Sequence, residues 1–176
     1  MSHVTTPWTV LASNVAKAIL ARKGVTVEEV AERFNKVHGT TESTRSIDGK
    51  IYRGTYSFAF FLQLLVALRV DCPQQWLPGL YGAEDYALLA KHVLLRELVS
   101  HSLDLESFVR NLGRDFELRR LAEDLAEQIE LGSFQFVVVL ELASIAWLDG
   151  FERFVDRSDV VSAAIARARI LKQAKE

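Results

Sequence analysis

The chain matches itself without a gap when it is shifted by 78 residues, so that residues 8–77 align with residues 86–155. The densest part of the match pairs residues 51–58 with residues 129–136, and both segments contain a glycine followed by Thr or Ser and an aromatic residue. Two amphipathic helices can align by chance because their apolar positions recur with the same period, but a shared glycine in a loop is harder to obtain that way. We therefore predict a tandem repeat.

The two copies differ in charge. Residues 8–77 contain nine basic and six acidic residues, a net charge of +3, whereas residues 86–155 contain seven basic and twelve acidic residues, a net charge of −5. The formal charge of the whole chain, −2, hides this difference. Opposite charges on two related halves indicate that the halves have different partners.

Apolar spacing of three and four residues predicts helices along nearly the whole chain. In the first copy we expect helices over residues 8–22, 26–38, 42–52 and 57–70. In the second copy we expect them over residues 84–101, 105–112, 115–129 and 134–148. Thr26 and Glu29 form a capping-box pattern, Asp104 takes the place of Thr26 in the second copy, and Gly24 and Gly54 are stop signals. A last helix, residues 159–175, begins after a predicted cap at Ser158.

These patterns predict an all-α fold of two duplicated four-helix helix-turn-helix-like units that pack together, followed by a C-terminal helix. Each unit has about 70 residues, near the lower size for independent stability, so the two are expected to share a core. We divide the chain into a basic repeat 1 (residues 1–78), an acidic, degenerate repeat 2 (residues 79–156) and the C-terminal helix (residues 157–176). The apolar residues of the connection, Trp76, Leu77, Leu80 and Tyr81, are expected to dock rather than form a free linker.

Composition restricts the setting of the protein. Cys72 is the only cysteine, which excludes an intrachain disulfide and fits a reducing cytoplasm. Residues 1–7 lack the charged and apolar regions of a leader, and no apolar run reaches the ~18 residues that a membrane span needs. We expect a cytoplasmic protein without membrane association.

No catalytic motif is present. The sequence lacks a P-loop, a nucleophile elbow, a zinc-protease helix, a calcium loop and a dinucleotide fingerprint. Its four histidines are scattered, the carboxylates of Glu123, Asp124 and Glu127 fit a solvated helix face, and Cys72 fits a packed thiol. We expect no enzyme activity, no catalytic residue, no metal site and no cofactor.

The third helix of the first copy is the candidate functional segment. A short helix, a turn, a second helix and an apolar supporting helix form the arrangement that places a recognition helix in the major groove of DNA. The candidate DNA-binding residues are Thr44, Arg45, Ser46, Lys50, Tyr52, Arg53 and Thr55. Basic side chains pair with phosphates or guanine edges, and hydroxyls donate to phosphate oxygens. The second copy has Gln128 and Leu131 in place of Lys50 and Arg53, and carboxylates nearby would repel phosphate.

The segments 24–34 and 50–62 resemble a bacterial helix-turn-helix-like domain of unknown function, distantly like the phage Cro/repressor (XRE-type) domains. The resemblance is carried by a lysine, Arg-Gly, an aromatic residue, Ser and an apolar helix, which are Lys50, Arg53, Gly54, Tyr56, Ser57 and Phe58 in this chain. The second copy keeps only Gly132, Phe134 and Phe136 of this pattern. The resemblance implies a DNA-binding or regulatory role for the first copy.

Two functions remain open from the sequence. The first is a transcriptional regulator that binds double-stranded DNA through repeat 1 as a homodimer, with repeat 2 serving packing, assembly or a protein partner. The second is a protein-interaction scaffold of duplicated helical modules that does not bind DNA. In that case Arg45, Lys50 and Arg53 are only the solvated face of a surface helix, which the low pI of 6.1 favours. Binding to DNA must weaken as salt rises, whereas an apolar protein interface responds little.

Overall fold

A computed structural model describes residues 5–114 and 119–173 of the chain, and side chains outside 113–123. The α-helices are α1 (Pro7–Lys23), α2 (Val27–His38), α3 (Thr44–Arg53), α4 (Phe58–Ala67), α5 (Tyr86–Ser100), α6 (Leu105–Arg114), α7 (Arg119–Leu131), α8 (Val137–Ile145) and α9 (Arg157–Gln173). Two short 3-10 helices, η1 (Gln74–Trp76) and η2 (Phe151–Arg153), follow α4 and α8. The described residues form no β-strand, so the fold is all-α, as predicted.

Local sequence signals account for most helix ends. The Thr26 N–H donates to Glu29 Oε2 (2.8 Å) and the Glu29 N–H donates to Thr26 Oγ1 (3.3 Å), which confirms the capping box. At the start of α6 the Ser107 N–H donates to Asp104 Oδ2 (2.8 Å). This bond to the charged carboxylate lowers the pKa of Asp104. The expected caps at Thr26 and Asp104 are therefore both present.

Several predicted boundaries were wrong by a few residues. Helix α4 ends at Ala67 rather than residue 70, because Arg69 adopts a left-handed conformation (φ 50°) and the Val70 N–H turns back to the Leu65 carbonyl (2.9 Å). Helix α8 begins at Val137 rather than residue 134. Helix α9 begins at Arg157, so Ser158 lies inside the helix instead of capping it. The expected start of α7 at residue 115 lies outside the described residues.

The two halves meet at an antiparallel pairing of short segments. Ser57 bridges Gln135, the residue 78 positions later. The Phe58 N–H donates to the Phe134 carbonyl (2.9 Å), and the Phe136 N–H donates to the Tyr56 carbonyl (3.0 Å). The two donors, Phe58 and Phe136, are 78 residues apart, and so are the two acceptors, Tyr56 and Phe134. Exchanging the two segments therefore converts one bond into the other, as a local two-fold axis would.

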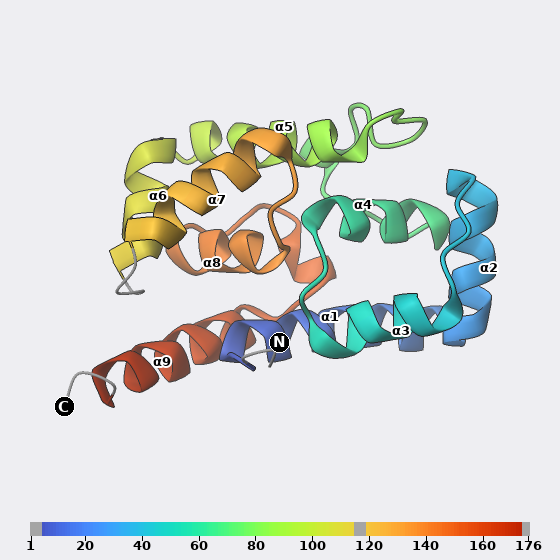
Figure 1. The fold of residues 1–176 in the computed structure, drawn as a ribbon, viewed down its shortest axis with the longest axis horizontal. Coiled ribbons are helices and arrows are strands. Elements are labelled where there is room, and N and C mark those ends of the chain that lie inside the picture. Colours follow the sequence, from blue (N-terminus) through green and yellow to red (C-terminus); the bar gives the residue numbers. More distant parts are fainter. Residues whose placement is uncertain (1–4, 115–118, 174–176) are drawn as a thin grey trace.

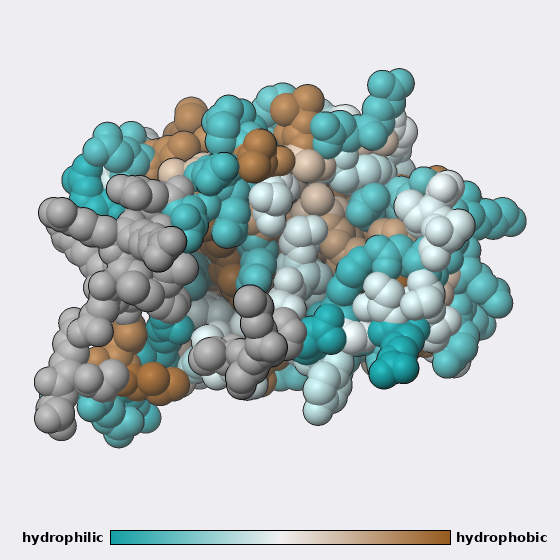
Figure 2. Space-filling model, in the orientation of Figure 1, coloured by the Kyte–Doolittle hydropathy of each residue, from teal (hydrophilic) through white to brown (hydrophobic). Residues whose placement is uncertain are grey.

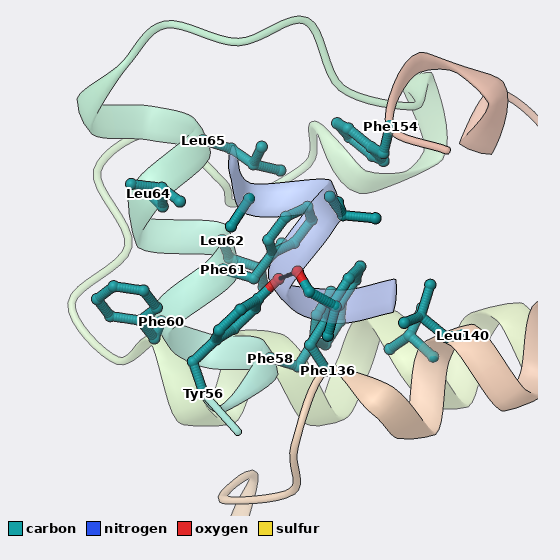
Figure 3. Close-up of a cluster of buried hydrophobic side chains, with 14 of the residues drawn as sticks. Tyr56, Phe58, Phe60, Phe61, Leu62, Leu64, Leu65, Phe136, Leu140 and Phe154 are labelled. Atoms are coloured by element: carbon teal, nitrogen blue, oxygen red, sulfur yellow. Dashed lines mark hydrogen bonds between the residues drawn. The ribbon is translucent and has the colours of Figure 1, made fainter. Parts of the chain in front are cut away.

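An aromatic cluster surrounds this pairing. The rings of Phe61 and Phe136 stack with their centroids 4.1 Å apart, and the ring centroid of Phe58 lies 6.1 Å from that of Phe136 (Figure 3). Trp76 and Phe154 stack at 5.7 Å on the same cluster. The buried Tyr56 hydroxyl donates to the Ala12 carbonyl (2.6 Å), and burial raises its pKa. The centre of the molecule is thus built by residues from both halves.

The remaining helices lie around this centre. Figure 1 shows α1 and α3 along one edge, α5 and α7 along the opposite edge, and α2 and α6 at opposite ends. Helix α9 packs against α1 and α8, where it buries Val160 and Ala163 but leaves Val161 and Ile165 about half exposed. None of the described helices is both long and apolar enough to cross a membrane.

The connection between the halves docks only in part. Trp76 and Leu80 are fully buried, as expected, and Trp76 Nε1 donates to the buried Glu97 Oε1 (2.6 Å). Leu77 and Tyr81 are instead 41% and 57% exposed. The docked residues hold the connection against α5, while its outer residues face solvent.

Gly54 and Gly132 tie α3 to α1 and α7 to α5. Both have φ near +65°, and an added β-carbon would lie 1.8 Å from the Thr9 carbonyl oxygen at Gly54 and 1.9 Å from the Ala87 oxygen at Gly132. Gly54→Ala is expected to lower the free energy of unfolding by about 2–4 kcal/mol, because it adds backbone strain and a clash with main-chain atoms. Urea denaturation measures the loss.

Gly24→Ala is the matched control, because Gly24 has the same left-handed conformation (φ +61°) with nothing within 4 Å of an added β-carbon. It is expected to cost only the backbone strain, about 1–2 kcal/mol. Equal losses for the two variants would contradict the close approach of α3 to α1.

Candidate nucleic-acid interface

Helix α3 follows α2 across the five residues 39–43 and presents one face to the core and one to solvent. Ile47 and Ile51 are buried against the rest of the fold. The Ser46 N–H donates to Ser43 Oγ (3.1 Å), which caps the start of the helix. The residues of α3 that point away from Ile47 and Ile51 are therefore available to a partner.

The structure divides the seven predicted residues into three groups. Arg45, Tyr52 and Arg53 are exposed, and Tyr52 is 72% exposed despite its large ring. Thr44, at the first turn of α3, and Thr55, after its last turn, are half-buried. Three of the predicted contacts thus lie on the open surface of α3, and two lie at its ends.

Ser46 and Lys50 belong to a local network instead. Both bind Glu42, which precedes α3: Lys50 Nζ forms an ion pair with Glu42 Oε1, and Ser46 Oγ donates to Glu42 Oε2 (2.6 Å). Lys50 Nζ also lies 5.1 Å from the ring centroid of Phe60. The hydrogen bond from Lys50, followed by that from Ser46, lowers the pKa of Glu42. The charge of Lys50 is therefore largely compensated within the protein.

Two further residues, which were not predicted from the sequence, belong to this surface. Asp48 is exposed between Arg45 and Tyr52 and places a carboxylate on the outer face of α3. Lys17 of α1 has its Nζ 5.0 Å from the ring centroid of Tyr52. Asp48 follows from helical spacing, since it lies three residues after Arg45 and four before Tyr52. Lys17 has no such signal, because its place depends on the packing of α1 against α3.

In the second half, the described residues at the corresponding positions are acidic or uncharged. Asp124, Glu127 and Glu130 of α7 are exposed, and Gln128 is exposed at the position that corresponds to Lys50. Lys91 Nζ lies 2.6 Å from Glu130 Oε1, so a basic residue here already has an acidic partner. The described side chains of α7, residues 124–131, thus include three carboxylates and no basic group.

Other groups offer little chemistry. Cys72 is buried, and its thiol donates to the Val70 carbonyl (3.2 Å). Burial, with a smaller effect of the Asp71 charge, raises the pKa of Cys72 to about 11, so the thiol is protonated at neutral pH. Within residues 5–114 and 119–173, no three His, Cys, Asp or Glu side chains are placed to hold a metal ion.

Comparison with known proteins identifies one similarity. Residues 8–72 match the family model of a domain of unknown function (DUF6471). The match includes α1 to α4 and ends at Cys72, so the helices from α5 onward lie beyond it. No curated protein and no solved structure matches the chain. The match covers less than half of the chain and assigns no activity to it.

The contact between Glu42 and Lys50 makes stability depend on pH. The folded-state pKa of Glu42 lies below its ordinary value of 4.5, so its contribution is present above that value and is lost as pH falls through the folded pKa. Glu42→Gln is expected to lower the free energy of unfolding at pH 7 by up to about 1 kcal/mol. The difference in the free energy of unfolding between the variant and the wild type should become smaller at pH 3 than at pH 7, as measured by urea denaturation at both pH values.

Glu127→Gln serves as the control, because Glu127 is exposed on α7. This variant is expected to match the wild type at both pH values. A difference for Glu42→Gln that stays the same from pH 7 to pH 3 would count against the ion pair with Lys50.

Proposed function

We propose that the protein is a DNA-binding regulator that uses the outer face of α3 in repeat 1. The observation that carries this proposal is the exposure of Arg45, Tyr52 and Arg53 on a helix whose opposite face is anchored by Ile47 and Ile51. A rigid, anchored helix with protruding basic and aromatic side chains is suited to the major groove. Backbone phosphates are the first expected ligands of the two arginines.

The network around Glu42 refines the roles of the predicted residues. Arg45 and Arg53 are the expected DNA contacts, and Tyr52 and Thr55 can donate hydroxyl hydrogens to phosphate oxygens. Lys50 and Ser46 support the start of α3 through Glu42. Asp48 is expected to oppose non-specific binding, since its carboxylate repels phosphate.

Repeat 2 is expected to contribute assembly rather than DNA contacts. Its helix α7 presents Asp124, Glu127 and Glu130 to solvent. One module supplies few base contacts, so a homodimer that doubles the contact area is the expected DNA-binding form. The half-exposed Val161 and Ile165 of α9 offer apolar area for such a contact.

A protein-interaction role is the second candidate, and one feature favours it. An apolar groove of about 690 Å³ runs along α5 and includes Leu89, Leu95 and Val99. Val99 is 77% exposed, and Figure 2 shows apolar residues along the edge of the molecule where α5 lies. A helix or loop of another protein could bury these side chains. Such binding would respond little to salt.

Charge reversal on α3 tests the first proposal. Arg45→Glu/Arg53→Glu is expected to weaken binding to pooled genomic DNA fragments at least about tenfold, because two phosphate contacts become repulsive. Wild-type affinity should fall steeply between two salt concentrations. The slope of log affinity against log salt concentration should be shallower in the variant by the amount that about two phosphate contacts contribute. Filter retention and sequencing measure affinity and sequence preference together.

The matched control is Arg169→Glu/Lys172→Glu, which makes the same change of charge on two exposed residues of α9. It is expected to bind DNA nearly as the wild type does. An equal loss of DNA affinity in both variants would show a general effect of charge. If the wild type retains no DNA, the protein-interaction role replaces the DNA-binding role.

A further inference from the structure

A cavity of about 270 Å³ opens between α1 and the C-terminal end of α3. Ser13 and Lys17 line it from α1, and Tyr52, Arg53 and Thr55 line it from the other side. The close approach of Gly54 to the Thr9 carbonyl holds the two walls together. The cavity is therefore formed by packing that the fold itself requires.

The lining of this cavity is cationic and lacks a counter-charge. Lys17 and Arg53 supply two positive charges, and no acidic residue lines the cavity. Within the described part of the chain, neither cation takes part in an ion pair. The Tyr52 ring, 5.0 Å from Lys17 Nζ, holds the ammonium group beside the opening. The arrangement favours an anion from outside the chain.

A buried hydroxyl in the same cavity points to the same kind of ligand. Ser13 is only 4% exposed, and its Oγ has no hydrogen-bond partner among the described residues. A buried polar group without a partner destabilises a protein, and almost all such groups are paired. An oxyanion in the cavity would accept a hydrogen bond from Ser13 and from the two cations at once.

In the second half, two of the corresponding positions form an ion pair within the chain. The 78-residue offset relates Ser13 to Lys91 and Tyr52 to Glu130, and these two counterparts form an ion pair of 2.6 Å. The offset also relates Lys17 and Arg53 to leucines 95 and 131. At these four positions repeat 2 has one cation paired with one carboxylate, whereas repeat 1 has two cations and no carboxylate.

We infer that the cavity between α1 and the end of α3 binds a phosphate group. Arg53 and Lys17 neutralise its charge, and Ser13 and Thr55 donate hydrogen bonds to its oxygens. The phosphate comes from a DNA backbone or from a free phosphorylated compound. The DNA source rests on the proposed function, because Arg53 would then act as a backbone contact that sets the position of α3 in the groove.

Inorganic phosphate titrated into the full chain at constant ionic strength is the first test. NMR should show saturable shifts of backbone amides around residues 13, 17 and 53–55. Lys17→Leu/Arg53→Leu, which introduces the residues of repeat 2, is expected to weaken this binding at least about tenfold. Arg169→Leu/Lys172→Leu on α9 is the control and should retain it.

Ser13→Ala gives a test that does not depend on charge. Removal of the unpartnered hydroxyl should leave the free protein at least as stable as the wild type and should weaken phosphate binding. Saturable shifts that are confined to this cavity, and phosphate affinity that falls in both variants, support the inference. Absence of saturable shifts, or shifts that survive both variants, overturns it.

Duplex DNA separates the two sources of phosphate. If the ligand is a backbone phosphate, Lys17→Leu/Arg53→Leu should make the slope of log DNA affinity against log salt concentration shallower, by the contribution of one to two phosphate contacts. Phosphate binding without any DNA binding would support the cavity with a free ligand and would refute the proposed regulator. DNA binding with unchanged salt dependence, together with no phosphate binding, would refute the cavity and leave the regulator in place.

Discussion

The antiparallel pairing of residues 56–58 with residues 134–136 is the constraint on which the rest of the fold depends. Its two hydrogen bonds lie inside the aromatic cluster, where an unpaired backbone group would be costly. Each half has about 70 residues, too few for a large core of its own, and the shared cluster of Phe58, Phe61 and Phe136 supplies one. The two halves therefore stabilise each other.

The geometry of the surface proposed to bind DNA depends on this core through Gly54. The absence of a side chain at Gly54 lets the end of α3 meet the Thr9 carbonyl of α1. That approach brings Lys17 beside Tyr52 and creates the cavity that Arg53 lines. Packing and the proposed binding are linked here, because Gly54 both permits the close contact of α3 with α1 and determines which cations lie on one surface.

The halves keep similar frameworks but differ in what they expose. Helix boundaries, the glycine contacts and the central pairing recur with the 78-residue offset. The solvent side differs, since Lys17 and Arg53 correspond to leucines, and Tyr52 corresponds to Glu130. Buried positions tolerate little change because cores are close-packed, whereas surface charges can change at small cost to stability. One framework can thus carry a basic and an acidic face.

The sequence by itself determined the helical class, the capping of α2 by Thr26 and the left-handed ends at Gly24 and Gly54, because these depend on residues within one or two turns. It also identified α3 as the segment with exposed arginines. Only the tertiary structure decided that Glu42 engages Lys50 and that Lys17 lies beside Tyr52. Such partners are chosen by the path of a loop and the packing of helices distant in sequence, which periodicity and local propensity do not specify.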